Sequence, residues 1–443
     1  MKKQLLCLLI MVLAVSMIST FSLAGSKKLE PITVVMNAGT QNLAEWQEKV
    51  KSIYPGELNF VNLPENEMYN KVQLEMLSGG KSYDVWFTGA GGAKQYGSGD
   101  MLEPLPPLEN EDDFFKGDVN QYKVGDIFYG YPVSADINIL YYRTDLLKAA
   151  GFDGPPKTWD DFRKMAIKLT VDKNGKSSDE EGFDPNNIEV WGGEFKGSNT
   201  MAATWEFWNY LYQNEGQAIK IDEANKTYDV TIDEPEAIEA LQWVVDNYSK
   251  YGIYPKGCIN YDYNEFVAMF TQERIAMAIN WPYMADMASA KDSNVAGKFA
   301  VGLMPKGKVN AGQIGGWSVN VLKNSTKKDS AIAFAQWMAT KDTMDLYCVT
   351  TTNTPVRLSL MKQRIADAPD DFAKMKWQAI NDNLQYGKGM DLVATGVSWM
   401  ACDTAIQTVI NQALAGQITP EEGFKQVAVK IEEILKSNKF MEE

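Results

Sequence analysis

The side chains in this chain that could do chemistry are acids, amides, hydroxyls and large aromatic rings. The 443 residues include 12 Trp and 20 Tyr but no His. Without His, the chain cannot form a Ser-His-Asp or Cys-His nucleophilic triad, a His-ligated zinc site or a His general base. Carboxylate chemistry and the reversible binding of a ligand remain.

The charge of the chain narrows the choice of ligand and partner. Lys and Arg total 43 against 58 Asp and Glu, a formal net charge of -15. A protein this negative is a poor partner for nucleic acid or an anionic membrane surface. Arg, whose planar fork suits carboxylates and phosphates, occurs only five times. The composition therefore disfavours polyanionic ligands, and the many aromatic rings favour a carbohydrate over a polyamine.

The first residues have the pattern of a secretory signal. Met1 to Lys3 precede an apolar run from Leu5 to Ile18, and Ser22 to Ala24 offer small residues to signal peptidase. The run is shorter than the roughly 20 residues of a membrane span. Residues 1–24 are therefore expected to be removed. Cys7 leaves with them, so we expect no lipid-attachment cysteine and a free periplasmic protein.

Neither the cysteines nor the acids indicate a metal or a cofactor. The mature chain has an odd number of cysteines, which favours buried thiols over a disulfide framework; they are Cys258, Cys348 and Cys402. Asp172, Asn174 and Glu180 faintly resemble a calcium loop, but Gly175 falls too early for an EF-hand. A polar turn is the favoured interpretation of this segment, and we expect no metal site.

Strands and helices alternate in the first hundred mature residues. The apolar, β-branched strand candidates are 32–36, 58–61 and 83–87, and the helical spacings fall at 43–53 and 69–77. Continuous apolar strands separated by helices predict an α/β fold with a parallel sheet covered on both faces. Ligands then lie beyond the carboxyl ends of the strands, so Thr40, Gln41 and Thr88 are candidate contacts.

From Tyr131 onward, several short segments follow one another in a distinctive order. They are Tyr131 to Asp136, Ile139 to Leu147, Ala150-Gly151, Pro156 to Phe162, Ala276 to Trp281, Gly315 to Val319, Thr354 to Arg357 and Gly416 to Glu422. In this order they resemble the family 1 extracellular solute-binding proteins of ABC importers, and above all the sugar-binding, maltose-binding-protein-like members. The resemblance covers essentially the whole mature chain.

The resemblance implies a type II periplasmic-binding-protein fold, with two α/β lobes around a cleft and three chain crossings between them. The crossings would lie near Val133 to Asn138, Phe299 to Pro305 and Val349 to Arg357. The first lobe would hold residues 25–134 and 303–352, and the second lobe 137–300 and 356–443. Each proposed crossing is an extended apolar or β-branched stretch next to Pro or Asn, which agrees with this division.

The resemblance also implies which side chains face the ligand. Asp136 matches a sugar-contacting carboxylate and would accept bonds from hydroxyls; the alternative is that it satisfies nearby backbone. One of Trp281 and Tyr283 would stack on the apolar face of a sugar, while the other packs in the core. Trp399 matches the family's stacking Trp. Asp403 lies four residues later on the same predicted helix, so the two would share a face.

Further residues are candidates from their position in the chain. Trp317 follows two glycines, where a ligand can approach the backbone, so it lies in either the cleft or the core. Glu194 lies in a loop that the family often directs into the cleft, or is a surface acid. Arg357 is the one Arg near a proposed crossing. Trp205 and Trp208 are expected to be the packing face of a helix.

These features imply a receptor that binds a sugar without altering it. Closure of the lobes would trap the ligand, and the transmembrane permease subunits of an ABC importer would read the closed form. We expect a monomer with no cofactor and no enzymatic activity. One alternative is a secreted glycoside hydrolase, which needs aromatics and two carboxylates but no His; the chain shows no barrel recurrence. Another is the same fold with a polyamine in an acid-ringed site.

Overall fold

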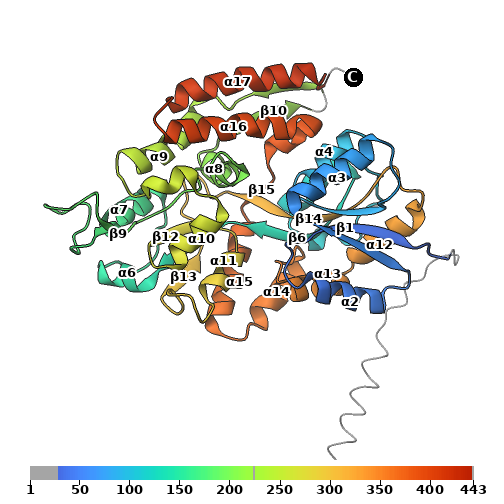
Figure 1. Cartoon of the computed structure of the whole chain (residues 1–443), viewed down its shortest axis with the longest axis horizontal. Coiled ribbons are helices and arrows are strands. Elements are labelled where there is room, and N and C mark those ends of the chain that lie inside the picture. The colour runs from blue at the N-terminus through green and yellow to red at the C-terminus, as the bar shows by residue number, and fades with distance from the viewer. Residues whose placement is uncertain (1–27, 223–224, 442–443) are drawn as a thin grey trace, which may run out of the picture.

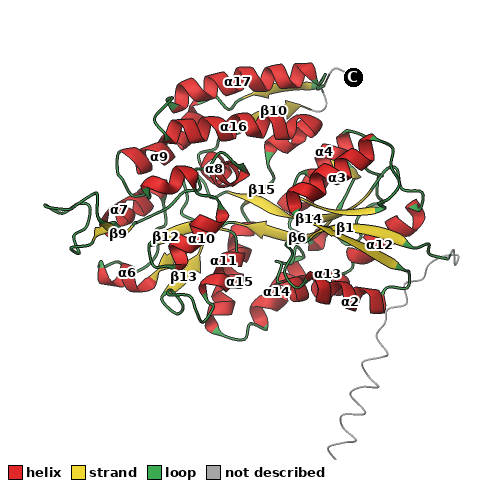
Figure 2. Ribbon diagram, in the orientation of Figure 1, coloured by secondary structure: helices red, strands yellow, loops and turns green. Residues whose placement is uncertain are grey.

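The computed structural model describes residues 28–222 and 225–441. Two α/β lobes lie side by side, with strands passing from one to the other through the middle of the molecule (Figure 1). The expected signal sequence, including Cys7, lies outside the described residues. The predicted α/β class is present throughout, since helices surround both main sheets (Figure 2).

The larger sheet forms the core of one lobe. Its strands are β1 (Ile32–Asn37), β2 (Leu58–Leu63), β3 (Val85–Gly89), β6 (Tyr131–Ile137), β14 (Gly312–Val321) and β15 (Gly387–Lys388). β1 pairs in parallel with β2 and β3, as predicted. β14 inserts between β3 and β6 and runs antiparallel to both. The parallel pairing predicted for the first three strands is therefore confirmed, and β14, which comes from a distant part of the chain, makes the whole sheet mixed.

Apolar residues cover this sheet on both faces. Val34 and Met36 of β1 join one buried cluster, whereas Val35 joins another, because successive side chains of a strand point to opposite faces. Helices on the first face are α2 (Leu43–Ile53), α12 (Lys328–Met338) and α13 (Lys341–Thr351); those on the second are α3 (Glu65–Leu77) and α4 (Gly92–Ser98). Short elements connect α4 to β6: η1 (Glu111–Asp113), α5 (Lys116–Val119), η2 (Asn120–Tyr122), β4 (Lys123–Val124) and β5 (Ile127–Phe128).

The other lobe is built around a three-stranded antiparallel sheet. β7 (Ile139–Arg143) lies between β12 (Met277–Asn280) and β13 (Phe299–Gly302). Two further antiparallel strand pairs lie outside this sheet: β8 (Val171–Asp172) with β9 (Ile188–Val190), and β10 (Ile219–Asp222) with β11 (Thr227–Val230). The surrounding helices are α6 (Thr144–Ala149), α7 (Trp159–Leu169), α8 (Met201–Gln213), α9 (Pro235–Ser249), η3 (Lys256–Asn260), α10 (Tyr263–Thr271), α11 (Tyr283–Ala288), α14 (Leu358–Ala366), α15 (Asp371–Leu384), η4 (Asp391–Ser398), α16 (Trp399–Leu414) and α17 (Pro420–Ser437).

Local signals in the sequence account for two of these helix starts. Thr158 caps α7 and Thr419 caps α17, each accepting a backbone N–H three residues on, while the acid at that third position accepts from the cap's own N–H. This reciprocal pairing satisfies two N–H groups that a helix end otherwise leaves free. The residue types that make both caps, a Thr followed three residues later by an acid, are visible in the sequence itself.

The chain passes between the two sheets at three places. Asn138, which is buried, separates β6 of the larger sheet from β7 of the smaller one. Residues 303–311 lead from β13 back to β14, and residues 352–357 connect α13 to α14. One apolar cluster contains residues of both sheets, among them Phe87 and Phe299, so the lobes share a core next to the connecting strands.

The polar segment that faintly resembled a calcium loop is a backbone turn. The Asp172 carboxylate accepts N–H bonds from Asn174, Lys176 and Asp184, at 2.8, 3.0 and 2.9 Å. Across the described residues, no three His, Cys, Asp or Glu side chains come together as a metal site. The three cysteines in this range are free and buried. In residues 28–222 and 225–441, no helix has the length and apolarity needed to cross a membrane.

Candidate ligand-binding site

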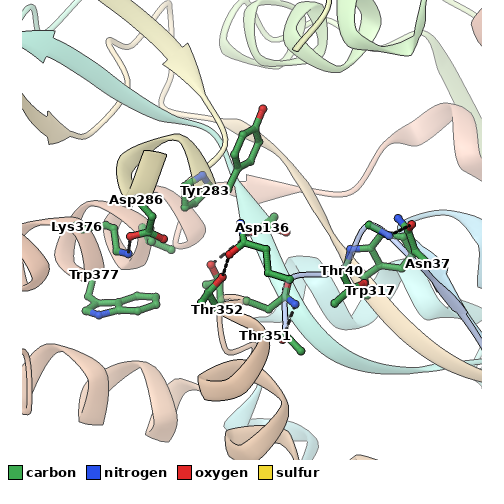
Figure 3. Close-up of a pocket in the computed structure, with 16 residues that line it drawn as sticks. Asn37, Thr40, Asp136, Tyr283, Asp286, Trp317, Thr351, Thr352, Lys376 and Trp377 are labelled. Carbon is green, nitrogen blue, oxygen red and sulfur yellow. Dashed lines mark hydrogen bonds and ion pairs between the residues drawn. The ribbon is translucent and has the colours of Figure 1, made fainter. Parts of the chain in front are cut away.

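A pocket of about 300 Å³ lies between the two sheets and takes its lining from both lobes. Figure 3 shows Asp136 at the middle, Thr40, Asn37 and Trp317 on one side, and Tyr283, Asp286, Lys376 and Trp377 on the other. The remaining lining residues are Gly39, Gln41, Pro282, Thr351, Thr352, Asn353, Thr354 and Ile380. This volume is at the lower end of the range that small-molecule sites occupy.

The floor of the pocket is formed where β6 pairs with β14. Asp136 pairs with Gly315, and Ser134 pairs with Trp317. Because side chains two residues apart on a strand share a face, Asp136 and Trp317 project from the same side of the sheet, with the bare backbone of Gly315 between them. The floor therefore presents a carboxylate and an indole ring to one space.

The Asp136 carboxyl has a pKa near neutral pH. Burial raises its pKa to about 7, and a hydrogen bond with Thr354, whose Oγ1 lies 3.5 Å from Oδ1, offsets this only in part. Behind it, Asp118 is fully buried, and burial followed by the charge of Asp136 raises the Asp118 pKa well above its usual value. A hydrogen-bonding ligand that replaces water here would favour the ionised, accepting form of Asp136.

The first-lobe wall consists of short polar side chains in two loops. Asn37 ends β1 and Thr40 lies in the loop that follows, where Asn37 Oδ1 accepts the N–H of Gly39 at 2.8 Å. Thr352, at a positive φ of 59°, ends α13, and its hydroxyl donates to Gln41 Oε1 at 2.8 Å. Strand-end geometry brings Thr40 and Gln41 into the pocket, where the sequence predicted them.

The second-lobe wall combines aromatic rings with one neutralised charge. Tyr283 begins α11 and is half-buried; burial raises its pKa to about 12, so the phenol keeps its proton. From α15, Trp377 lines the pocket beside Lys376, whose Nζ lies 4.9 Å from the ring centroid and 2.6 Å from Asp286 Oδ1. The wall therefore offers flat apolar surface and little net charge.

Trp281 lies directly behind this wall. It is 8% exposed, its Nε1 donates to the hydroxyl of Tyr263 at 3.2 Å, and its ring meets Trp205 edge-on at 5.6 Å. A Cβ at Gly315 would approach the Trp281 ring to 3.1 Å, so the indole packs on the floor strand. Of the two neighbouring aromatic candidates, Tyr283 lines the pocket and Trp281 supports it.

Trp399 and Asp403 share a face of α16, as predicted, but they are buried between elements. Asp403 accepts bonds from Gln407 Nε2 at 2.6 Å and Thr204 Oγ1 at 3.1 Å, and burial raises its pKa to about 6. The Trp399 ring packs against Gly91, where a Cβ would lie 3.2 Å from it. Trp399 Nε1 and Asp403 Oδ1 have no hydrogen-bond partner.

Three other candidates also lie outside the pocket lining. Thr88 is buried and its hydroxyl donates to the next carbonyl at 3.1 Å. Glu194 is 1% exposed, with neither carboxylate oxygen bonded, and burial raises its pKa well above the usual range. The Arg357 guanidinium binds Asp113 at 3.2 Å and the carbonyl of Ala339 at 2.6 Å. The structure thus gives Arg357 intramolecular partners.

Several lining residues were missed from the sequence. Nothing in the sequence singled out Asp286, Lys376 or Trp377, since α15 is a polar helix in which one Trp does not stand out. The threonines after α13 could have been found, because they adjoin the third expected crossing and hydroxyl side chains cluster there from 350 to 354.

The structure combines a pocket between two α/β lobes with strands that run from one lobe to the other. The model of the family described as bacterial extracellular solute-binding protein matches residues 37–345. The chain belongs to this family, as its resemblance implied, and the family is a class of binding proteins rather than enzymes.

The individual relatives of this chain are distant in sequence. A probable ABC transporter-binding protein of Deinococcus radiodurans is 26% identical over 60% of this chain and 60% of its own length. The match thus spans less than two thirds of that relative. The mannitol-binding protein of Pseudomonas aeruginosa is 24% identical over 63% and 61% of the two chains. The maltodextrin-binding protein of Bacillus subtilis is 24% identical over 72% of each.

Solved structures show the same fold. Maltose-bound MalE3 of T. maritima matches with a TM-score of 0.73 and 24% identity, over 91% of this chain and all of the other. The sugar-binding protein MalE of Xanthomonas citri matches with a TM-score of 0.76 and 18% identity, over 93% and 98%. These likenesses confirm the predicted two-lobed, maltose-binding-protein-like fold.

Proposed function

We propose that this protein is the extracytoplasmic receptor of an ABC importer and that its pocket binds a neutral sugar or sugar alcohol. The observation that carries the proposal is the composition of the pocket. It combines a carboxylate floor, a wall of hydroxyls and amides, and a wall of aromatic rings in one space of about 300 Å³.

The two surfaces of a sugar match these parts. The hydroxyls of a sugar form hydrogen bonds with planar polar groups, and the strongest of these hydrogen bonds are to a carboxylate such as Asp136. The apolar C–H face of a sugar stacks on aromatic rings, which Tyr283, Trp317 and Trp377 offer. The names of the relatives, which bind mannitol and maltodextrin, support the same ligand class.

A polyamine fits this pocket less well. Its lining acids are Asp136 and Asp286, and Asp286 is already paired with Lys376 at 2.6 Å. A polyamine would need acids placed along its length, and the pocket instead offers rings and hydroxyls between these two. The strongly acidic composition of the chain therefore does not by itself define the ligand.

Binding is expected to work by closure of the two lobes. We place the first lobe at residues 25–134 and 303–352 and the second at 137–300 and 356–443, with the hinge in the three connecting segments. A ligand touched by both walls favours the closed arrangement, because only that form makes both sets of contacts. The permease would read the closed surface, and the receptor would act as an exported monomer without nucleic acid as a partner.

The alternative of a glycoside hydrolase makes a different prediction. A hydrolase needs two carboxyl groups on either side of the glycosidic bond, one of them protonated. Incubation with oligosaccharides should yield no new reducing ends, and binding should be saturable and reversible. Turnover of excess oligosaccharide would overturn the receptor proposal.

The deciding experiment is a thermal-shift screen of the mature protein against sugar alcohols, mono-, di- and oligosaccharides, and polyamines, with calorimetric titration of the hits. A ligand at a hundred times its dissociation constant adds about 2.7 kcal/mol to the stability of the folded state. We expect a sugar or sugar alcohol to raise the midpoint and Asp136→Ala to abolish the rise. A shift with polyamines alone, weakening sharply with salt, would contradict the proposal.

A further inference from the structure

Lys196 and Glu206 form an ion pair that lies inside the second lobe. Lys196 Nζ is 2.6 Å from Glu206 Oε2, and the two side chains are 1% and 0% exposed. Removing two charges from water is costly, and apolar residues of similar volume often fill such a space with equal or greater stability. Stability of the lobe alone therefore does not explain the pair.

The Lys196 ammonium connects three separate elements. Besides Glu206 on α8, it donates to the carbonyl oxygen of Ile279 on β12 at 3.2 Å. It also lies 3.9 Å from the ring centroid of Phe266 on α10, a favourable position for a cation over an aromatic face. One cation thus fixes the mutual position of α8, β12 and α10.

Each of these elements carries, or is directly followed by, one member of an aromatic cluster: Trp205 is on α8, Tyr263 is on α10, and Trp281 follows the last residue of β12. Trp205 directly precedes Glu206 on α8, and Trp281 follows Ile279 by two residues. Tyr263 lies three residues before Phe266, on the first turn of α10. Each residue that the ammonium contacts is therefore close in the sequence to one ring of the cluster.

The aromatic cluster extends from the ion pair to the pocket. Trp281 donates its Nε1 to the Tyr263 hydroxyl at 3.2 Å and meets Trp205 at 5.6 Å with an interplanar angle of 66°. Its far edge approaches Gly315, the residue paired with Asp136 on the floor. Pro282 and Tyr283, the next residues in the chain, line the pocket.

We propose that Lys196 is a positioning residue for ligand binding, with Glu206 as its counter-charge. The ammonium fixes the relative positions of α8, β12 and α10. Through its packing, the aromatic cluster then fixes the positions of Tyr283 and of the floor strand. The inference rests on the proposed function, since it concerns the same pocket, but its first test needs no ligand.

That test uses ¹⁹F NMR of protein labelled with 5-fluorotryptophan, with the Trp205, Trp281 and Trp46 signals assigned from Trp→Phe variants. In Lys196→Met we expect the Trp205 and Trp281 resonances to shift or broaden. Trp46, in the core of the first lobe, should keep its resonance. Unchanged Trp205 and Trp281 signals in a folded variant would overturn the proposal.

The second test measures affinity for the panel sugar or sugar alcohol that raises the wild-type midpoint most. Lys196→Met should weaken binding tenfold or more, and Lys196→Arg, which keeps the cation, should recover part of the loss. The matched control is Arg143→Met. Arg143 is another buried cation of the same lobe, 5% exposed against 1% for Lys196 and paired with Asp145 at 2.6 Å, and this variant should bind within twofold of wild type.

The outcomes separate the two proposals. Equal losses in Lys196→Met and Arg143→Met would mean a general weakening of the lobe and would contradict a positioning role. If Lys196→Met does not fold, Glu206→Gln takes its place in both tests, because it keeps the shape and removes the charge. If no panel ligand binds wild type, the proposed function fails, while the NMR result still decides the role of Lys196.

Discussion

The two walls of the pocket are built in different ways. The first-lobe wall consists of short polar side chains on loops. The Thr352 hydroxyl donates to Gln41, the backbone N–H of Thr40 donates to the Asn37 carbonyl, and all three residues are at least partly open to solvent. The second-lobe wall consists of rings on helices, and a buried aromatic cluster and the Lys196–Glu206 pair stand behind it.

We expect the two walls to contribute differently to ligand binding. A hydrogen bond from an exposed side chain replaces a bond to water, so its net contribution is only about 0.5–1.5 kcal/mol. An aromatic ring held in place by its neighbours loses little freedom on binding and covers much apolar surface. We therefore expect affinity to come from Asp136 and the second lobe, and the first lobe to contribute orientation.

The largest effect is expected from the floor between the walls. Asp136→Ala should weaken sugar binding about 100-fold, since bonds to a charged acceptor contribute about 1.5–3 kcal/mol each. Isothermal titration calorimetry of the best panel ligand checks this. Asp286→Ala is the matched control, because that acid lines the same pocket but is paired with Lys376, and it should cost no more than about threefold. Equal losses would remove the special role of Asp136.

The aromatic wall should come next. Tyr283→Ala and Trp377→Ala should each weaken binding about tenfold, because each removes a stacking surface worth about 0.5–1.5 kcal/mol beyond its buried area. Conservative changes to Phe should restore most of the affinity if apolar contact dominates. Full loss in Tyr283→Phe would instead identify the phenol as a hydrogen-bonding group, and tryptophan fluorescence titrations distinguish these results.

Binding should also depend on pH through Asp136. Its pKa of about 7 means that the accepting, ionised form increases between pH 6 and 8, so affinity should rise roughly five- to tenfold over this range. Asp136→Asn should show a flat profile. A wild-type profile equally flat would show that the carboxyl does not titrate in the ligand's presence.

The unliganded protein should show the opposite trend in stability. The folded-state pKa of Asp136 lies above its ordinary value of 3.8, so its contribution is fully present below that value and is lost as pH rises through about 7. Asp136→Asn should therefore gain in thermal midpoint over wild type at pH 8 and lose that advantage at low pH. Paired melting curves across this range provide the measurement.

The smallest effects are expected on the first-lobe wall. Thr40→Val and Gln41→Ala should weaken binding only two- to threefold, which corresponds to about 0.5 kcal/mol, because water replaces the lost bonds. Losses as large as those of Tyr283→Ala would contradict the proposed division between the walls.

Much of the fold could be predicted because its signals are local. β1, β2 and β3 appear as short apolar runs, and the caps at Thr158 and Thr419 lie beside the helices they start. The place of β14 could not be predicted, since its neighbours β3 and β6 lie far away in the sequence and periodicity does not encode pairing partners.

The candidate site was predicted less completely, for a related reason. Residue type and family position brought Thr40, Gln41, Asp136, Tyr283 and Trp317 to the pocket. Residue type and family position do not show that Trp281, only two residues from Tyr283, packs behind the pocket and not in its lining. Side-chain direction depends on packing against distant segments, as the burial of Glu194 and the pairing of Arg357 with Asp113 also show.

The central position of β14 has a consequence for how the protein is made. The first-lobe sheet lacks an inner strand until Val321 has left the ribosome, although β1, β2 and β3 are synthesised within the first ninety residues. Contacts between such distant segments form slowly. We therefore expect the leading half of the chain to complete its sheet only after β14 has been synthesised, which suits the export proposed above, because an incompletely folded chain can still pass through a translocation channel.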